Sequence, residues 1–310
     1  FGVAFLIARL LAEAFLKPVH ELDAGMLRIQ QRNLDNPVKI DAGDEIGELG
    51  LVFNQMVEDL REMQLAKTVQ DALFPQKKLE IAGYDTAVFY LTATDLGGDY
   101  CDHVQIGANR YLFLIGDVSG HGTPAALCMA MVKAAVFKAC RDGFEFAALP
   151  GNISSLLLRV VKRKKMMTML FVLLDTADNS LGLINSGHNW PLIIRKDGRV
   201  QELKVMGLPL GTRAPKKKDN VELQILQPGD IFFSYTDALI ECLDPNGLMF
   251  GHEAMYLELA RTAGFSPDQV VAHMESVWRQ YQAGGPQLDD LTMMVIKHHD
   301  RCIGGSANDH

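Results

Sequence analysis

The spacing of apolar residues divides the 310-residue chain into an N-terminal part with helical periodicity and a longer part with short apolar runs. In the first part, apolar residues recur at alternating steps of three and four, which is the a/d pattern of a coiled coil. One stripe comprises Val19, Leu22, Met26 and Ile29, and a second comprises Ile46, Leu49, Phe53, Met56, Leu60 and Met63. Because two such short helices cannot bury their own stripes, we predict a parallel bundle of two chains, and hence a homodimer.

The apolar stretch at residues 1–16 precedes these stripes. A membrane-spanning helix needs about 20 apolar residues, and Arg9 and Glu13 interrupt this stretch. Two interpretations stay open: an amphipathic helix, or the cytoplasmic end of a membrane helix whose start is missing from the chain. We expect residues 1–16 to be the end of a transmembrane helix, with the rest of the chain in the cytoplasm and the full-length protein at the cell membrane.

The coiled-coil pattern changes after Met63. Two steps of three residues follow one another, which is a stammer and locally overwinds a coiled coil. The stripe continues at Ala66, Val69 and Leu73, and Pro75 then ends the helix. We interpret residues 64–80 as a helical switch segment between two domains.

From Ile81 onward, short apolar runs indicate buried strands separated by helices. Strands are predicted at 111–115, 169–174, 231–235 and 291–296, and helices at 123–140, 252–263 and 267–282. This order predicts an α+β domain over residues 81–300, in which sheets pack on each other with helices outside. Residues 301–310 are expected to form a loose tail.

Acidic residues stand where several of these strands end or begin. Asp117 and Asp237 end strands, Asp289 and Asp290 precede one, and Asp99 follows Gly97-Gly98 before another. Carboxylates brought together repel one another unless a cation lies among them. With oxygen ligands and no set of His or Cys residues, the sequence predicts a site for Mg²⁺ or Mn²⁺.

Charge and cysteine content narrow the classes of protein further. The chain has 30 basic and 38 acidic residues, for a net charge of −8. A nucleic-acid-binding protein should carry a basic surplus, so DNA and RNA are not expected partners. The five cysteines include no C-x-x-C pair. This argues against a disulfide scaffold or a thiolate zinc site and fits a reducing cytosol.

Residues 8–63 resemble a HAMP signalling module. The resemblance lies in Pro18, the D-E-I-G-E-L of 44–49 and the F-N-Q-M of 53–56. Such modules link a membrane sensor to a cytoplasmic output domain, so we assign residues 17–63 to a HAMP-like module. A plain dimerising coiled coil is the alternative interpretation.

Seven further motifs occur in order over residues 66–292. They are A-K-T-V-Q-D-A-L-F-P (66–75), G-G-D-Y-C-D (97–102), G-D-V-S-G-H-G (116–122), N-S-G-H-N-W-P (185–191), G-L-P-L-G (207–211), P-G-D-I-F-F-S-Y-T-D (228–237) and D-D-L-T (289–292). Together they resemble the metal-dependent serine/threonine phosphatases of the protein phosphatase 2C (PPM) class, in their bacterial SpoIIE-type branch. The resemblance implies an α-β-β-α layered sandwich.

The resemblance also implies roles for individual residues. Asp117 would bridge two metal ions, and the Val118 carbonyl would bind the first. Asp237 and Asp289 would hold the second ion, and Asp99 would act through metal-bound water. Asp290 would be a neighbour rather than a ligand, although the sequence leaves open which of the two adjacent acids points inward. Ala238 follows Asp237 where the family usually has glycine.

The function implied is hydrolysis of phosphoserine or phosphothreonine on a partner protein, typically an anti-sigma-factor antagonist, by water activated between two Mn²⁺ or Mg²⁺ ions. Signals from the upstream HAMP module would set the competence of this site. One alternative is a catalytically inactive phosphatase fold used for binding. Another is a histidine-kinase-type ATPase, because D-V-S-G-H-G is similar to a D-x-G-x-G loop. However, the sequence lacks a phosphoacceptor-histidine helix after Met63, and no Asn-bearing helix precedes the loop.

Two histidines and two lysine runs have open roles. His121 and His188 sit in glycine-flanked turns, where packing or hydrogen bonding is favoured over proton donation to the leaving oxygen. The runs 162–165 and 216–218 read as solvated loops. For both runs, the alternative is a patch that binds an acidic phosphoprotein.

Overall fold

The computed structural model describes residues 1–11, 15–40, 44–141, 143–212 and 216–299. The chain divides into two compact units, Phe1–Val69 and Gln70–His310. The boundary falls within the segment that the sequence predicts as a switch. The predicted tail at 301–310 lies outside the described residues.

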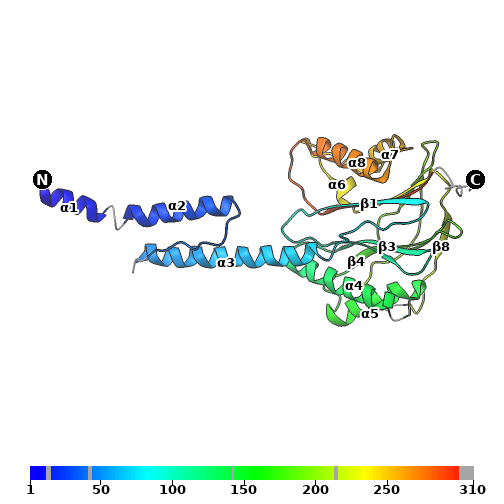
Figure 1. Ribbon diagram of the computed structural model, residues 1–310, viewed down its shortest axis with the longest axis horizontal. Coiled ribbons are helices and arrows are strands. Elements are labelled where there is room, and N and C mark those ends of the chain that lie inside the picture. The colour runs from blue at the N-terminus through cyan, green and yellow to red at the C-terminus, as the bar shows by residue number, and fades with distance from the viewer. Residues whose placement is uncertain (12–14, 41–43, 142, 213–215, 300–310) are drawn as a thin grey trace, which may run out of the picture. The chain divides into compact units, whose positions relative to one another are not determined.

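The first unit is helical (Figure 1). It contains α1 (Gly2–Leu11), α2 (Lys17–Gln30) and most of α3 (Glu45–Asp71). Pro18 lies in the first turn of α2, where its missing N–H costs no hydrogen bond. Helix α3 runs without interruption through the predicted stammer and ends before Pro75.

The connector between α2 and α3 is held against both helices by a small core. Leu34, Val38, Phe53 and Val57 are buried together. The Asn54 side chain binds the backbone of Val38 twice: it accepts from the N–H at 2.9 Å and donates to the carbonyl at 2.9 Å. Part of each apolar stripe is therefore buried by contacts within a single chain.

The rest of each stripe is exposed in the single chain. Exposed fractions are 57% for Met26, 50% for Leu49 and 46% for Met56. A row of large apolar side chains at these heptad positions is the pattern expected for a partner helix. The exposure supports the predicted homodimer, which stays a prediction.

The second unit contains two five-stranded antiparallel sheets. In one sheet the order is β2 (Asp99–Gln105), β3 (Arg110–Val118), β4 (Met167–Asp175), β5 (Ser180–Ser186) and β8 (Glu222–Ile225). In the other the order is β1 (Tyr84–Leu91), β10 (Leu291–His298), β9 (Ile231–Tyr235), β6 (Leu192–Ile194) and β7 (Val200–Glu202). We call them the β3 sheet and the β10 sheet.

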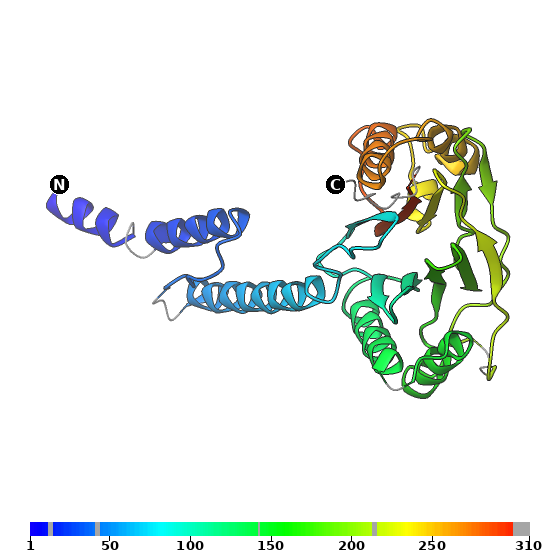
Figure 2. The same cartoon turned by 45° about the vertical axis from the view of Figure 1, so that its right-hand side comes forward.

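Helices cover the outer faces of the two sheets (Figures 1 and 2). On the β3 sheet lie α4 (Thr123–Arg141) and α5 (Leu149–Val160), preceded by the short helix η2 (Phe146–Ala148). On the β10 sheet lie α6 (Ala238–Glu241), α7 (Gly251–Ala260) and α8 (Pro267–Gln282). The predicted α-β-β-α sandwich is confirmed.

Strand β10 shows why its apolar run is continuous rather than alternating. Met293 and Val295 pack in the core beneath α7 and α8. Met294 and Ile296 pack in the core that includes the β3 sheet. Both faces of the strand are buried, which a layered fold with helices on each side requires.

Among the described residues, one helix, α4, is long and apolar enough to cross a membrane. Ala125, Val132 and Val136 on its inner face are fully buried in the same core as the β3 sheet. Helix α1 is short, and its Val3, Phe5 and Leu6 side chains are exposed. The predicted membrane anchor at residues 1–16 therefore stays a prediction.

Candidate metal centre

Two of the predicted acids are neighbours across one strand pair. Asp99 is the first residue of β2 and lies directly opposite Asp117 of β3. Opposed residues in an antiparallel pair share one face, with Cβ atoms about 5 Å apart. The sheet register alone therefore brings these two carboxylates together.

The other acids lie at an edge of the β10 sheet. Asp237 comes two residues after the end of β9, and Asp289 and Asp290 immediately precede β10. The N–H of Thr236 donates to the carbonyl of Thr292 at 3.0 Å, which extends the pairing of β9 with β10 to the site. Asp237 and the acidic pair thus meet where these two strands end and begin.

Two threonines at this edge of the β10 sheet bind Asp99 of the β3 sheet. The hydroxyls of Thr236 and Thr292 both donate to Oδ2 of Asp99, at 3.0 and 2.5 Å. All three side chains are buried. These bonds fix the Asp99 carboxylate between the sheets. The sequence reasoning missed the threonines because their role depends on sheet packing.

The structure distinguishes the two adjacent acids. Asp290 is 3% exposed, and its carboxylate accepts from the N–H groups of Ala93 at 2.7 Å and Gly98 at 2.6 Å. Asp289 is exposed, and its Oδ1 caps the N–H of Asp290 at 2.8 Å. Asp290 holds a loop, which leaves Asp289 as the member of the pair available to a metal ion.

Glycines allow the loop at 97–98 to approach this site closely. A Cβ on Gly98 would lie 2.9 Å from the Val118 carbonyl, and one on Gly97 would lie 2.6 Å from Asp290 Oδ2. Any larger residue would displace the carbonyl or the carboxylate. The G-G-D motif therefore positions Asp99 through steric fit.

The acids raise one another's pKa values. Burial and then the charge of Asp117 raise the pKa of Asp99 well above its ordinary value. The pKa of Asp117 rises to about 7, first through burial and then through the charges of Asp237, Asp289 and Asp290, while Lys165 partly offsets this. The pKa of Asp237 is also raised, by burial, Glu241 and Asp289.

Carboxylates this close together repel one another, and a bound cation would relieve that repulsion. Carboxylates and a carbonyl are oxygen donors, which suit Mg²⁺ and Mn²⁺ rather than softer metals. Within the described ranges, no three Asp, Glu, His or Cys side chains already stand at metal-binding spacing. The donor set fits a divalent ion, and the ligand assignments stay predictions.

A glutamine that sequence reasoning did not single out binds the same loop. Gln70, in the last turn of α3, is buried, and its amide pairs with both backbone groups of Gly97. It donates to the Gly97 carbonyl at 2.7 Å and accepts from the Gly97 N–H at 3.1 Å. The sequence signal that could have identified Gln70 is its position in the first phosphatase-like motif, residues 66–75.

The remaining motif residues take supporting positions. His188 is buried, and its Nδ1 lies 3.0 Å from the Thr168 hydroxyl. Burial lowers its pKa to about 4, so the ring is neutral near pH 7. This favours the packing interpretation for His188. His121 is exposed. Ala238 suits its position because residues 238–241 form a helix.

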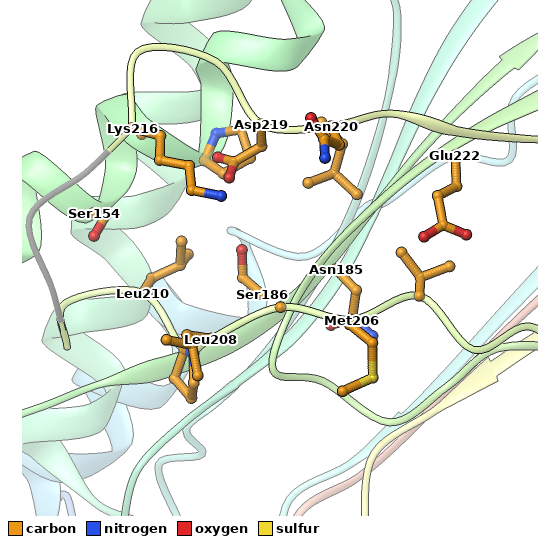
Figure 3. A pocket seen from close by; sticks show the side chains of 16 residues that line it. Ser154, Asn185, Ser186, Met206, Leu208, Leu210, Lys216, Asp219, Asn220 and Glu222 are labelled. Carbon is orange, nitrogen blue, oxygen red and sulfur yellow. The ribbon is translucent and has the colours of Figure 1, made fainter.

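A separate cavity of about 220 Å³ lies between α5, β5 and the segments 205–210 and 216–222 (Figure 3). Ser154, Ser186, Lys216 and Asp219 are among the residues that line it. Figure 3 shows the Lys216 amine pointing into this cavity. None of the predicted metal ligands lines it.

Residues 107–299 match the family described as Stage II sporulation protein E (SpoIIE). The chain belongs to this SpoIIE family. Residues 10–62 match the HAMP domain, which confirms the resemblance of the N-terminal part to a HAMP module. A HAMP domain indicates a membrane-anchored signalling protein.

Known proteins similar to this SpoIIE-family chain include phosphatases. The phosphoserine phosphatase RsbU of Bacillus subtilis is 26% identical over 189 residues, covering 61% of this chain and 56% of that protein. Protein IcfG of Synechocystis sp. is 23% identical over 332 residues, covering 90% of this chain and 51% of that protein. The chain thus spans about half the length of these curated relatives.

Solved structures confirm the fold of the SpoIIE-family unit. The SiaA-PP2C domain of Pseudomonas aeruginosa superposes with a TM-score of 0.70 at 22% identity, covering 78% of this chain and 98% of that domain. At this identity the likeness establishes the PP2C-type fold.

Proposed function

We propose that this chain is a metal-dependent phosphoprotein phosphatase that hydrolyses phosphoserine or phosphothreonine on a partner protein. One observation carries the proposal: carboxylates from both sheets gather, with Asp99 opposite Asp117 across β2 and β3, and burial followed by the charges of Asp237, Asp289 and Asp290 raises the pKa of Asp117 to about 7. The similarity to RsbU, a phosphoserine phosphatase, supports the reaction type. An anti-sigma-factor antagonist is the substrate class that the family resemblance favours.

Asp117, Asp237, Asp289 and the Val118 carbonyl would hold two Mn²⁺ or Mg²⁺ ions. When bound, these ions supply an activated water and neutralise charge on the phosphoryl oxygens. Asp99, fixed by two threonine hydroxyls, orients water at the edge of the site. Asp290 holds the loop that carries Asp99. Burial lowers the pKa of His188 to about 4, so near pH 7 its ring lacks the second proton that an imidazolium acid would donate.

The assay that tests this function is phosphate release from a phosphoserine peptide with Mn²⁺, with Mg²⁺ and with chelator. We expect release with either metal and none with chelator. Metal-independent release, or no release under any condition, would contradict the proposal. The second result would favour the inactive binding protein, and ATP binding measured by calorimetry would favour the kinase-type alternative.

We further propose that Gln70 transmits the state of α3 to the metal centre. Its two hydrogen bonds tie the helix end to Gly97, and the next residue, Gly98, donates to Asp290. Movement of this helix end would therefore move the loop that positions Asp99. This would link the upstream HAMP domain to catalysis through α3.

The Gln70→Ala variant should change metal dependence and also lower fold stability. It leaves both backbone groups of Gly97 without partners, at a cost of about 1–3 kcal/mol each when buried. We expect the Mn²⁺ concentration for half-maximal activity to shift at least about fivefold. Gln64→Ala, at an exposed position of the same helix, is the matched control. Equal metal dependence of both variants and wild type would exclude the coupling.

The exposed stripe of the HAMP unit should form the dimer interface. Leu49→Glu combined with Met56→Glu places charges at half-exposed seam positions, so we expect a monomer in sedimentation velocity. Leu51→Glu, at a 72% exposed position off the stripe, should remain a dimer. A dimer that survives the seam variant would refute this arrangement. Membrane attachment through residues 1–16 completes the proposal for the full-length protein.

A further inference from the structure

A groove runs along α4 beside the loop that follows α5. Its volume is about 500 Å³. Leu127, Met131 and Val160 line it, which we call the apolar floor, and so do Lys162, Lys164 and Lys165, which we call the basic rim. Leu127 is 62% exposed and Val160 is 53% exposed, although both are large apolar side chains. The groove therefore combines an apolar floor with a basic rim.

The basic rim is joined to the candidate metal centre. Lys165 donates from Nζ to the carbonyl of Ser119, two residues after Asp117. The Ser119 N–H donates to the Met166 carbonyl at 2.9 Å, and the Met166 N–H donates to the Ser119 hydroxyl at 3.1 Å. The groove thus lies beside the segment that carries Asp117.

The charge of the groove indicates what kind of ligand it binds. The chain as a whole is acidic, with a net charge of −8, yet lysines cluster at this rim. Lysine ammonium groups attract phosphate and carboxylate groups, and they steer association more than they add affinity. The exposed apolar floor requires apolar side chains on the same ligand.

We propose that this groove binds the segment of the substrate protein that flanks the phosphoserine, and that this segment carries both acidic and apolar side chains. The inference rests on the proposed phosphatase function and deepens it. Lys165 contacts the substrate nearest the phosphate, while Lys162 and Lys164 contact acidic residues farther along. Leu127 and Val160 receive an apolar side chain.

Binding can be measured apart from turnover with a phosphonate peptide. In this probe a methylene replaces the bridging oxygen of phosphoserine, so the P–C bond is not hydrolysed. A fluorescein-labelled peptide with flanking Glu and Leu residues is titrated with the full chain in Mn²⁺, and anisotropy gives the Kd. A second peptide has Gln in place of each Glu.

The Lys162→Glu/Lys164→Glu variant tests the rim, with Lys216→Glu/Lys217→Glu as a control of equal charge change. Lys216 lines the separate cavity of Figure 3. We expect the rim variant to raise the Kd for the acidic peptide at least about fivefold and the control less than about twofold. For the Gln peptide, all three proteins should have similar Kd values.

Equal Kd values of wild type and rim variant for the acidic peptide would overturn the inference, as would equal weakening by the control. A change of oligomeric state in the rim variant, seen by sedimentation, would also overturn it, because the groove would then be an interface between two copies. Failure of wild type to release phosphate from phosphoserine peptides would instead refute the proposed function, and the binding measurements would separate the two failures.

Discussion

Replacing Asp117 by Ala should lower Mn²⁺-dependent phosphate release at least about a thousandfold, because the acid proposed to hold both ions would support their binding and charge neutralisation together. The side chain is only partly buried and faces other acids, so its loss removes repulsion rather than packing. We therefore expect an intact fold, measured by circular dichroism and by an unfolding temperature no lower than that of metal-free wild type.

The matched control is Asp175→Ala. Asp175 lies at the opposite end of β4 and pairs across the strands with Arg110. We expect this variant to keep activity within about threefold of wild type, since an exposed ion pair contributes little. Undiminished release by the Asp117 variant would reject the proposed centre.

Mn²⁺ should stabilise the protein much more at pH 8 than at pH 5. The pKa values of Asp99, Asp117 and Asp237 are all raised in the folded chain, that of Asp117 from 3.8 to about 7. The folded state then binds more protons than the unfolded state across this range, so metal-free stability falls as the pH rises. Bound cations favour the charged carboxylates and restore the lost stability.

Thermal unfolding with Mn²⁺ and with chelator at both pH values measures this effect. At pH 8 and a hundredfold excess of Mn²⁺ over its Kd, linkage gives about 2.7 kcal/mol for one site. We expect the difference in unfolding temperature between Mn²⁺ and chelator to shrink toward zero at pH 5. In the Asp117→Asn variant, the metal-free protein should be more stable than wild type at pH 8. If the difference in unfolding temperature between Mn²⁺ and chelator did not depend on pH, ionisation of these aspartates would not be its cause.

The parts of the fold that the sequence predicts well are those with strong local patterns. The buried runs at 111–115 and 231–235 lie within β3 and β9, and the helix predicted at 267–282 is α8. Strands β6, β7 and β8 have only three or four residues each, too few for a clear period. Their pairing depends on longer neighbours in the sheet.

The centre shows the same division between local and tertiary information. Strand ends were enough to select the acids, because a strand end has a recognisable pattern. Choosing between Asp289 and Asp290 required the N–H groups of Ala93 and Gly98, which are nearly 200 residues away in the chain. The contact of Gln70 with Gly97 likewise exists only after the helix end packs on the loop.

Anomalous scattering from manganese-soaked crystals tests the central claim most directly. The account predicts two manganese peaks about 4 Å apart, with Asp117 contacting both and Asp237 and Asp289 on one of them. Manganese bound at other side chains, or no peak among these aspartates at saturating metal, would contradict it.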